Sequence, residues 1–303
     1  MHLTIAAAST ALFSTWVFVE NFGLLFDAGD GISASLGQKG RKVRHVFVTH
    51  ADRDHVCGLL QLHQLNARDG IPHIFYPKDS GSFPALKDFM EKFDPQSGPA
   101  TWRGLAPGET VPLDKTHFIE ARTSEHVTMG DLTKSLDYTL CAVRRSLRPE
   151  LTGMNGAEIG ALRKEHGEDA VTEPQIEKLV GYSGDAPQLR PERWSGVKIL
   201  FHEATFLAPE TARSSHSNLP DVIASAAQLD LEALVLLHFS ARYKADEIVQ
   251  AVRQHAAAAK VGFPVFVILP GQVYSDLLST EPVWEPGCFL DREDCEERQE
   301  GLI

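Results

Sequence analysis

The chain has 303 residues, of which 43% are hydrophobic and 23% charged, which are ordinary fractions for a soluble globular protein with a large core. A formal net charge of −12 excludes general nucleic-acid binding through a broadly basic surface, so any contact with RNA needs a local basic patch. No apolar stretch is long enough for a transmembrane helix, and no basic segment precedes a hydrophobic run as in a signal peptide. We therefore expect a cytoplasmic protein without a membrane partner.

The first half of the chain alternates short apolar runs with turns, a pattern that is typical of strands. Strands are predicted at Leu3–Ala8, Trp16–Glu20, Leu24–Phe26, Val43–Thr49, Ile71–Tyr76, within Trp102–Glu120, and at Leu136–Val143. Helices are predicted at Val56–Asn66 and at Pro84–Phe93, where the apolar residues recur on one face.

A polar stretch, Arg144–Glu177, interrupts this pattern. It is rich in charge and glycine, and only Ala157–His166 within it is expected to be helical. We interpret residues 144–177 as a surface insertion or a shortened arm.

The second half repeats a strand, a loop and a helix. Strands are predicted at Leu179–Ser183, Val197–Phe201, Ala233–Leu237 and Pro264–Leu269, and helices at Leu219–Leu229 and Ala245–Ala259. We expect one domain over residues 1–280, followed by an acidic C-terminal tail over residues 281–303.

The four cysteines are Cys57, Cys141, Cys288 and Cys295. Their spacing matches neither a CxxC zinc cluster nor a dense disulfide framework. We expect reduced thiols, with Cys57 and Cys141 buried.

Several predicted strands end directly in a potential metal ligand. The residues that follow them are His50, Asp185, His202 and His238. In layered α/β folds the loops at strand ends converge on one edge of a sheet, so these side chains are expected to lie together. Histidine nitrogen and carboxylate oxygen suit zinc, and carboxylates also suit manganese or iron. The pattern therefore predicts a metal cluster.

The segment His50–His55 carries four potential ligands within six residues, straight after a buried strand. The structural alternative is a charged turn in which Asp52 or Asp54 caps the next helix, but this explains neither histidine. Taken alone, His126 could be a surface residue and His238 a hydrogen-bonded core histidine. Together with the His50–His55 segment, they are predicted to be ligands.

These residues carry a resemblance to the metallo-β-lactamase superfamily and, within it, to ribonuclease Z. The family's HxHxDH motif lies over His50–His55, and its preceding Asp-x-Gly-x-Gly turn lies over Asp27–Gly31. Further matches, in the family's order, are His126, Ser183-Gly184-Asp185, the HEATF element His202–Phe206, Ser215–Asn218, and the His-Phe-Ser-x-Arg-Tyr element His238–Tyr243. The last elements are more particular to the ribonuclease Z-like branch than the HxHxDH motif.

The resemblance implies a four-layer αβ/βα sandwich, in which two mixed sheets are flanked by helices. It also implies two divalent metal ions, with zinc as the expected metal. The first ion would be held by His50, Asp52 and His126, the second by Asp54, His55 and His238, and Asp185 would bridge them.

The resemblance further implies catalytic roles for Asp54, Glu203 and His216. Asp54 would orient the nucleophile, while Glu203 would orient His216, which protonates the leaving oxygen. Asp27 would order the ligand loop from behind the metal ligands, and His202 is not expected to be a ligand.

The chain departs from the family at two places. Asp52 replaces the second histidine of the HxHxDH motif, which should favour tolerance of manganese or iron or leave the first site weak or empty. The 144–177 stretch lacks the Gly/Pro-rich tip of the family's tRNA-gripping arm. Its Arg144, Arg145, Arg148, Arg163 and Lys164 could form a basic patch or simply be solvated.

Three functions stay open. The first is a metal-dependent phosphodiesterase of ribonuclease Z type that cuts precursor tRNA near its 3′ end. The second keeps the metal centre but hydrolyses a small phosphodiester or another ester. The third is a metal-poor binding or scaffold protein. The resemblance also implies a homodimer.

Overall fold

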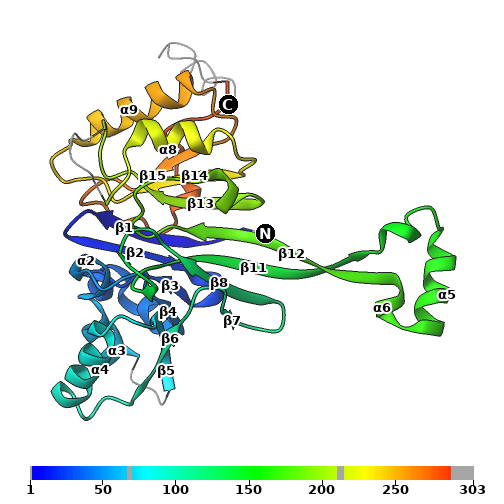
Figure 1. The fold of residues 1–303 in the computed structure, drawn as a ribbon, viewed down its shortest axis with the longest axis horizontal. Coiled ribbons are helices and arrows are strands. Elements are labelled where there is room, and N and C mark those ends of the chain that lie inside the picture. The colour runs from blue at the N-terminus through cyan, green and yellow to red at the C-terminus, as the bar shows by residue number, and fades with distance from the viewer. Residues whose placement is uncertain (1, 67–69, 210–214, 288–303) are drawn as a thin grey trace, which may run out of the picture.

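The computed structural model describes residues 2–66, 70–209 and 215–287, and Figure 1 shows their arrangement. One sheet has six strands, and its order follows the sequence. Its strands are β1 (Ile5–Thr10), β2 (Ser14–Val19), β3 (Leu24–Phe26), β4 (His45–Phe47), β5 (Gly70–Pro77) and β6 (Ala100–Leu105). Strands β1 to β3 pair antiparallel, and β3 to β6 pair parallel.

The second sheet has seven strands, in the order β15-β14-β13-β12-β11-β8-β7. They are β7 (Thr110–Pro112), β8 (His117–Thr123), β11 (Leu136–Leu147), β12 (Thr172–Tyr182), β13 (Val197–Glu203), β14 (Ala233–Leu237) and β15 (Val265–Val267). Pairing is antiparallel from β7 to β12 and parallel from β12 to β15. A separate hairpin joins β9 (Thr128–Met129) to β10 (Leu132–Thr133).

Helices cover the outer face of each sheet (Figure 1). The α-helices are α1 (Ile32–Leu36), α2 (Arg53–Val56), α3 (Leu59–Leu65), α4 (Ser82–Phe93), α5 (Gly156–His166), α6 (Glu168–Val171), α7 (Pro191–Trp194), α8 (Leu219–Ala226) and α9 (Ala245–Ala258). Short 3₁₀ helices are η1 (Glu20–Phe22), η2 (Gly37–Lys42), η3 (Pro149–Leu151) and η4 (Leu277–Ser279). None of these helices is both long enough and apolar enough to cross a membrane.

Three apolar clusters hold the layers together. One lies between the sheets and joins residues such as Phe26 and Phe47 of the first sheet to Tyr138 of the second. A second packs the first sheet against α1, α3 and α4, and a third packs the second sheet against α8 and α9. The expected four-layer αβ/βα sandwich of two mixed sheets is thereby confirmed.

The sequence of the parallel strands explains their position. All five residues of β14, Ala-Leu-Val-Leu-Leu, are buried, as expected for a strand that is covered on both faces. Helix α8 begins after Asn218, whose side chain accepts the Asp221 N–H, and has a proline in its first turn. These buried strands fix the edge at which His238 and its neighbours emerge.

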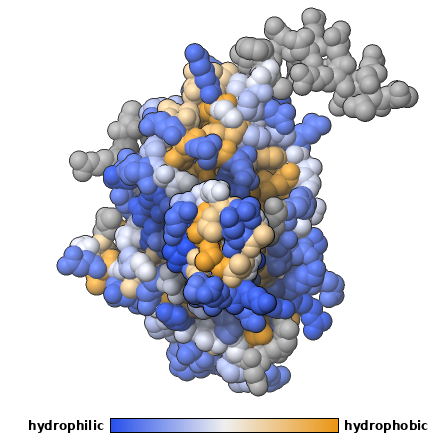
Figure 2. Space-filling model, turned by 90° about the vertical axis from the view of Figure 1, so that its right-hand side faces the viewer, coloured by the Kyte–Doolittle hydropathy of each residue, from blue (hydrophilic) through white to orange (hydrophobic). Residues whose placement is uncertain are grey.

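Strands β11 and β12 run far beyond the sandwich as an arm (Figure 1). Their pairing continues to Leu147 opposite Thr172, and the arm carries η3, α5 and α6 at its tip. A capping box between Asn155 and Glu158 begins α5, which has no buried residue. Seen end-on, apolar surface at the tip is bordered by hydrophilic surface (Figure 2).

Two local expectations were wrong. The helix predicted over Val56–Asn66 is two helices, α2 and α3, separated at Cys57 and Gly58. The Gly58 N–H donates to the Ala28 carbonyl oxygen at 2.8 Å rather than within the helix, and an added Cβ at Gly58 would stand 2.2 Å from the Gly29 carbonyl oxygen. Cys57 is exposed there, whereas Cys141 is buried as expected.

The predicted tail divides in two. Trp284 accepts the Val265 N–H at 2.9 Å and its ring contacts the apolar cluster under α9, so residues 281–287 pack on the sandwich. Residues 288–303, including Cys288 and Cys295, lie outside the described residues.

Candidate metal centre

Side chains from four segments of the chain meet at one edge of the sandwich. The loop after β4 carries His50 and Asp52, and α2 carries Asp54 and His55. Asp185 follows β12, His238 follows β14, and His126 lies between β8 and β9. The structure thus brings together all seven residues that the sequence predicted as metal ligands.

Asp185 lies at the middle of this cluster and faces it with both carboxylate oxygens. Its Oδ1 is 3.4 Å from Nε2 of His55 and 3.4 Å from Nε2 of His238. Its Oδ2 is 3.5 Å from Nε2 of His50 and 3.8 Å from Nε2 of His126. One oxygen therefore faces each half of the cluster, which is the arrangement that a bridging ligand requires.

The two halves correspond to two triads of possible ligands. The ligand atoms of His50, Asp52 and His126 lie within 4.8 Å of one another, and so do those of Asp54, His55 and His238. In the second triad all three residues are buried. In the first, the Asp52 side chain is 62% exposed, whereas that of His50 is 1% exposed. The two sites thus differ in their access to water.

Each candidate ligand histidine is held through Nδ1 by a partner behind it. His55 Nδ1 lies 2.8 Å from Asp27 Oδ2, and His126 Nδ1 lies 3.1 Å from the Ser215 carbonyl oxygen. Both partners accept, so these Nδ1 atoms carry the proton and the Nε2 atoms are left as lone-pair donors.

Two threonines fix the remaining tautomers. Thr205 Oγ1 donates to Glu203 and lies 2.9 Å from His238 Nδ1, so it accepts from that nitrogen. Thr49 Oγ1 donates to Asp27 and in the same way accepts from His50 Nδ1 at 2.9 Å. All four Nε2 atoms therefore turn lone pairs toward Asp185.

The residues present fit a bound divalent cation. Buried Nε2 atoms of His50 and His55 and buried Oδ1 of Asp185 have no hydrogen-bond partner within residues 2–66, 70–209 and 215–287. Unpartnered buried polar atoms are costly, and here they converge on the same space. A donor set of imidazole nitrogens and carboxylate oxygens suits zinc, manganese or iron.

The electrostatics keep His50 and Asp185 in ligand form. Burial lowers the pKa of His50, and the neighbouring His55 lowers it further, so its imidazole is neutral. Burial alone would raise the pKa of Asp185, but His238 and His55 hold it well below its ordinary value. A neutral imidazole beside an ionised carboxylate is what metal coordination needs. Burial opposes protonation of His55 and His126, but the neighbouring carboxylates raise the pKa of both, so a cation would displace a proton from each.

Glu203 and His216 form a second functional pair beside the triads. Glu203 is fully buried, and its Oε1 lies 3.0 Å from His216 Nδ1. Burial opposes protonation of His216, but the bond to Glu203 and the charge of Asp185 raise its pKa to about 9. His216 Nδ1 also lies 3.7 Å from Asp185 Oδ2, so a protonated imidazole lies beside the carboxylate that both triads face.

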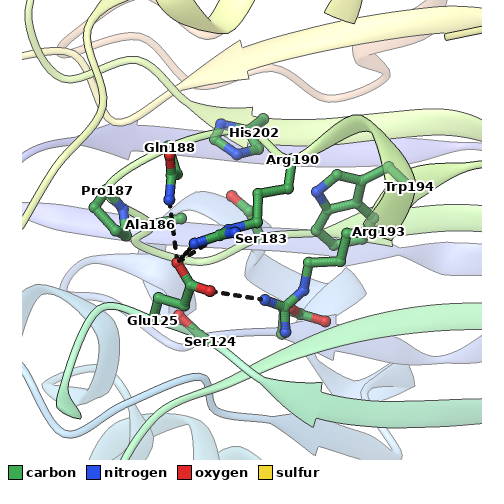
Figure 3. Close-up of a pocket in the computed structure, with 11 residues that line it drawn as sticks. Ser124, Glu125, Ser183, Ala186, Pro187, Gln188, Arg190, Arg193, Trp194 and His202 are labelled. Carbon is green, nitrogen blue, oxygen red and sulfur yellow. Dashed lines mark hydrogen bonds and ion pairs between the residues drawn. The ribbon is translucent and has the colours of Figure 1, made fainter. Parts of the chain in front are cut away.

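An ionic network holds the loop that carries His126 (Figure 3). Glu125 Oε2 accepts from Arg190 Nη2 at 2.9 Å, and Arg193 Nε lies 2.8 Å from Asp137 Oδ2. Arg190 and Arg193 belong to the segment that begins at Asp185, so the network ties His126 to the bridging carboxylate. We name Glu125, Arg190, Arg193 and Asp137 the loop clamp. Sequence reasoning missed it, and the only signal was a carboxylate next to a predicted ligand.

The fold and this edge cluster define a metallo-β-lactamase-type hydrolase, and comparison with known proteins agrees. The family model for the metallo-beta-lactamase superfamily matches residues 10–134. Ribonuclease Z of Haloferax volcanii is 30% identical over 251 residues, which cover 74% of this chain and 77% of that protein. The chloroplastic tRNase Z TRZ2 of Arabidopsis thaliana is 28% identical over 272 residues, which cover 82% and 71%.

Solved structures show the same fold. The metallo-beta-lactamase fold protein YhfI from Bacillus subtilis matches with a TM-score of 0.58 and 13% identity, covering 90% of this chain and 99% of its own. The short form of human tRNase Z matches with a TM-score of 0.55 and 16% identity, covering 90% and 98%. The chain belongs to the metallo-β-lactamase superfamily and, within it, to the ribonuclease Z-like branch, and it is a metal-dependent hydrolase.

Proposed function

We propose that this chain is a binuclear phosphodiesterase that cuts RNA, with the 3′ end of precursor tRNA as its substrate. The geometry of Asp185 carries the proposal, because one oxygen faces each triad and His216 lies 3.7 Å from the same carboxylate. Curated relatives named ribonuclease Z and tRNase Z support the choice of RNA.

We assign the first ion to His50, Asp52 and His126, and the second to Asp54, His55 and His238, with Asp185 shared. Zinc is the expected ion, and Asp52 should widen the tolerance to manganese or iron. When bound, two such ions lower the pKa of a water molecule and stabilise charge on the attacking and leaving oxygens of an in-line displacement.

The side chains around the ions would do the remaining work. Asp54 Oδ2 accepts the Leu12 N–H at 2.9 Å, which holds the carboxylate 3.2 Å from His238 Nε2, where it can orient the nucleophile. Glu203 holds His216 in the protonated form, and His216 would donate that proton to the leaving oxygen.

The arm bears on the choice between precursor tRNA and a small phosphodiester. It leaves the sandwich at the end of β11 and β12 opposite to Asp185, and so could contact a large substrate far from the cut. However, residues 144–177 contain seven carboxylates against five Lys and Arg. Four of its arginines form ion pairs within or beside the arm: Arg144 with Glu177, Arg145 with Asp169, Arg148 with Glu150, and Arg163 with Glu168.

These ion pairs favour a second candidate function, in which the same metal centre hydrolyses a small phosphodiester. A phosphate backbone would have to compete with the carboxylates that already neutralise those arginines. The third candidate, a binding or scaffold protein without turnover, is weakened by the buried Glu203 and by His216, for which a scaffold has no evident use.

The three candidates can be separated with two substrates and two variants. Hydrolysis of bis(p-nitrophenyl) phosphate should appear when metal ions are added back and should be lost in Asp54→Ala. Absence of turnover with every ion tried, with ligand binding intact, would favour the scaffold. Removing residues 148–169 should lower cleavage of precursor tRNA but not of the small ester if tRNA is the substrate, and an equal response of both would favour the small ester.

We further propose a cytoplasmic homodimer, as the resemblance implies. Light scattering on a sizing column should give twice the chain mass, and a monomer at micromolar concentration would contradict it.

A further inference from the structure

The turn between β1 and β2 exposes two large apolar side chains beside the metal centre. Leu12 is 87% exposed and Phe13 is 65% exposed. Leu12 also has a φ of 70°, a left-handed conformation that a bulky residue rarely adopts. Its N–H donates to Asp54 Oδ2 at 2.9 Å, so the turn directly contacts the second triad.

The side chain of Leu12 is 87% exposed and so packs little against residues 2–66, 70–209 and 215–287. The backbone N–H, which every residue except proline carries, makes the bond to Asp54. Glycine would make the same bond without the strain of the left-handed conformation and without exposing a butyl group to water. Strained backbone of this kind clusters at active sites and ligand contacts, so its position beside the metal centre motivates a functional role for Leu12.

The turn is a fixed platform. The Ala11 N–H donates to the Phe239 carbonyl oxygen at 3.2 Å, and the Phe13 N–H donates to the Thr10 carbonyl oxygen at 3.0 Å. The Ser14 hydroxyl donates to the Asp30 carbonyl oxygen at 2.7 Å. These bonds hold the backbone of the turn, so little backbone entropy is lost when a ligand covers the two side chains.

We propose that Leu12 and Phe13 form a stacking platform for a nucleobase next to the scissile phosphodiester. The inference rests on the proposed function for the phosphodiester itself. A chain of net charge −12 gains little from long-range attraction of a phosphate backbone, so contacts close to the centre have to contribute affinity. Stacking of bases on aromatic side chains such as Phe13 is strong and tolerates any base sequence, and Leu12 would add an apolar contact beside it.

The test compares two ligands that differ only in the base. Adenosine 5′-monophosphate and ribose 5-phosphate are titrated by calorimetry into the metal-loaded wild-type protein and its variants. We expect the wild type to bind the nucleotide more tightly by about tenfold, as one stacked base provides. Phe13→Ser and Leu12→Gly should each reduce this ratio severalfold. Phe13 makes no hydrogen bond to a metal ligand in the described part of the chain, so Phe13→Ser should leave the affinity for ribose 5-phosphate the same.

Phe93 offers a matched control, because it is 66% exposed but lies at the end of α4. Phe93→Ser should keep the wild-type ratio.

Leu12→Gly should also unfold at the wild-type temperature or above it, because it relieves the strain at this position. Equal binding of the two ligands by the wild type, or an unchanged ratio in both platform variants, would overturn the proposal. The ratio is independent of turnover, so a protein that shows it but cleaves no phosphodiester would refute the proposed function alone.

Discussion

Removing Asp52 should weaken one metal ion and leave the other in place. Asp52 Oδ2 lies 3.6 Å from His50 Nε2 and 3.9 Å from His126 Nε2, and no atom of the second triad comes from this residue. Asp52→Ala deletes a charged donor that is 62% exposed and so already partly screened by water. A charge-assisted contact of this kind contributes roughly 1.5–3 kcal/mol, so the affinity of the first site should fall by roughly 10- to 150-fold.

Metal titration in competition with a chelator measures this directly. The wild type should show two binding steps, and Asp52→Ala should move only the weaker step. Asp88→Ala is the control, since the Asp88 side chain is 64% exposed but lies in none of the metal-ligand triads. Asp52→His should instead strengthen the first step for zinc relative to manganese, because it exchanges a hard oxygen for an imidazole nitrogen.

Two results would refute this reasoning. Unchanged binding of both ions in Asp52→Ala would show that Asp52 is not a ligand. Loss of both ions together would show that the triads do not act as separable sites.

Three further predictions concern the surroundings of the centre. Glu125→Gln should loosen the loop clamp and lower the affinity of the first metal site about tenfold. Glu109→Gln loses a comparable surface ion pair and should leave that affinity unchanged. Equal chelator titrations of the two variants would contradict the role of the clamp. Burial raises the pKa of Asp137 to about 6, above its value near 4 in an unfolded chain. Between these two pH values the folded state binds one proton more than the unfolded state. The folded state should therefore lose on the order of 3 kcal/mol of stability as pH rises from 4 to 6. Asp137→Asn should remove this pH dependence from urea unfolding, and an unaltered slope would show that the carboxyl titrates normally. Gly184→Ala should destabilise the fold by about 1–3 kcal/mol, because the φ of Gly184 is +56° and a Cβ would stand 2.6 Å from Thr49. Gly108 has a φ of +83°, but a Cβ there would meet no atom within 4 Å, so Gly108→Ala should unfold closer to the wild-type temperature.

The sequence predicted the layers and the placement of the ligands because both depend on local patterns. Val46–Val48 and Ala233–Leu237 are uninterrupted apolar runs, and a buried parallel strand delivers the residue after it to the sheet edge. Each run therefore predicts that its histidine, His50 or His238, lies at an edge of its own sheet, and the packing of the two sheets brings these edges together. The motif order from Asp27 to Tyr243 indicated the family, which the relatives confirm.

Other features depend on contacts between segments that are distant in the sequence. Gly58 alone does not predict the break between α2 and α3, because its N–H donates to Ala28, a residue of a distant turn. The length of β11 could not be read from apolar periodicity, because Arg144–Leu147 pairs with β12 outside the core. Glu125 is tied to the site through Arg190, and the backbone of Leu12 through Asp54.

The central claim is that Asp185 joins two metal sites. Anomalous diffraction from crystals of the metal-loaded protein tests it most directly. We expect two peaks, one beside Oδ2 near His50 and His126, and one beside Oδ1 near His55 and His238. A single peak, or peaks that leave Asp185 uncoordinated, would contradict it.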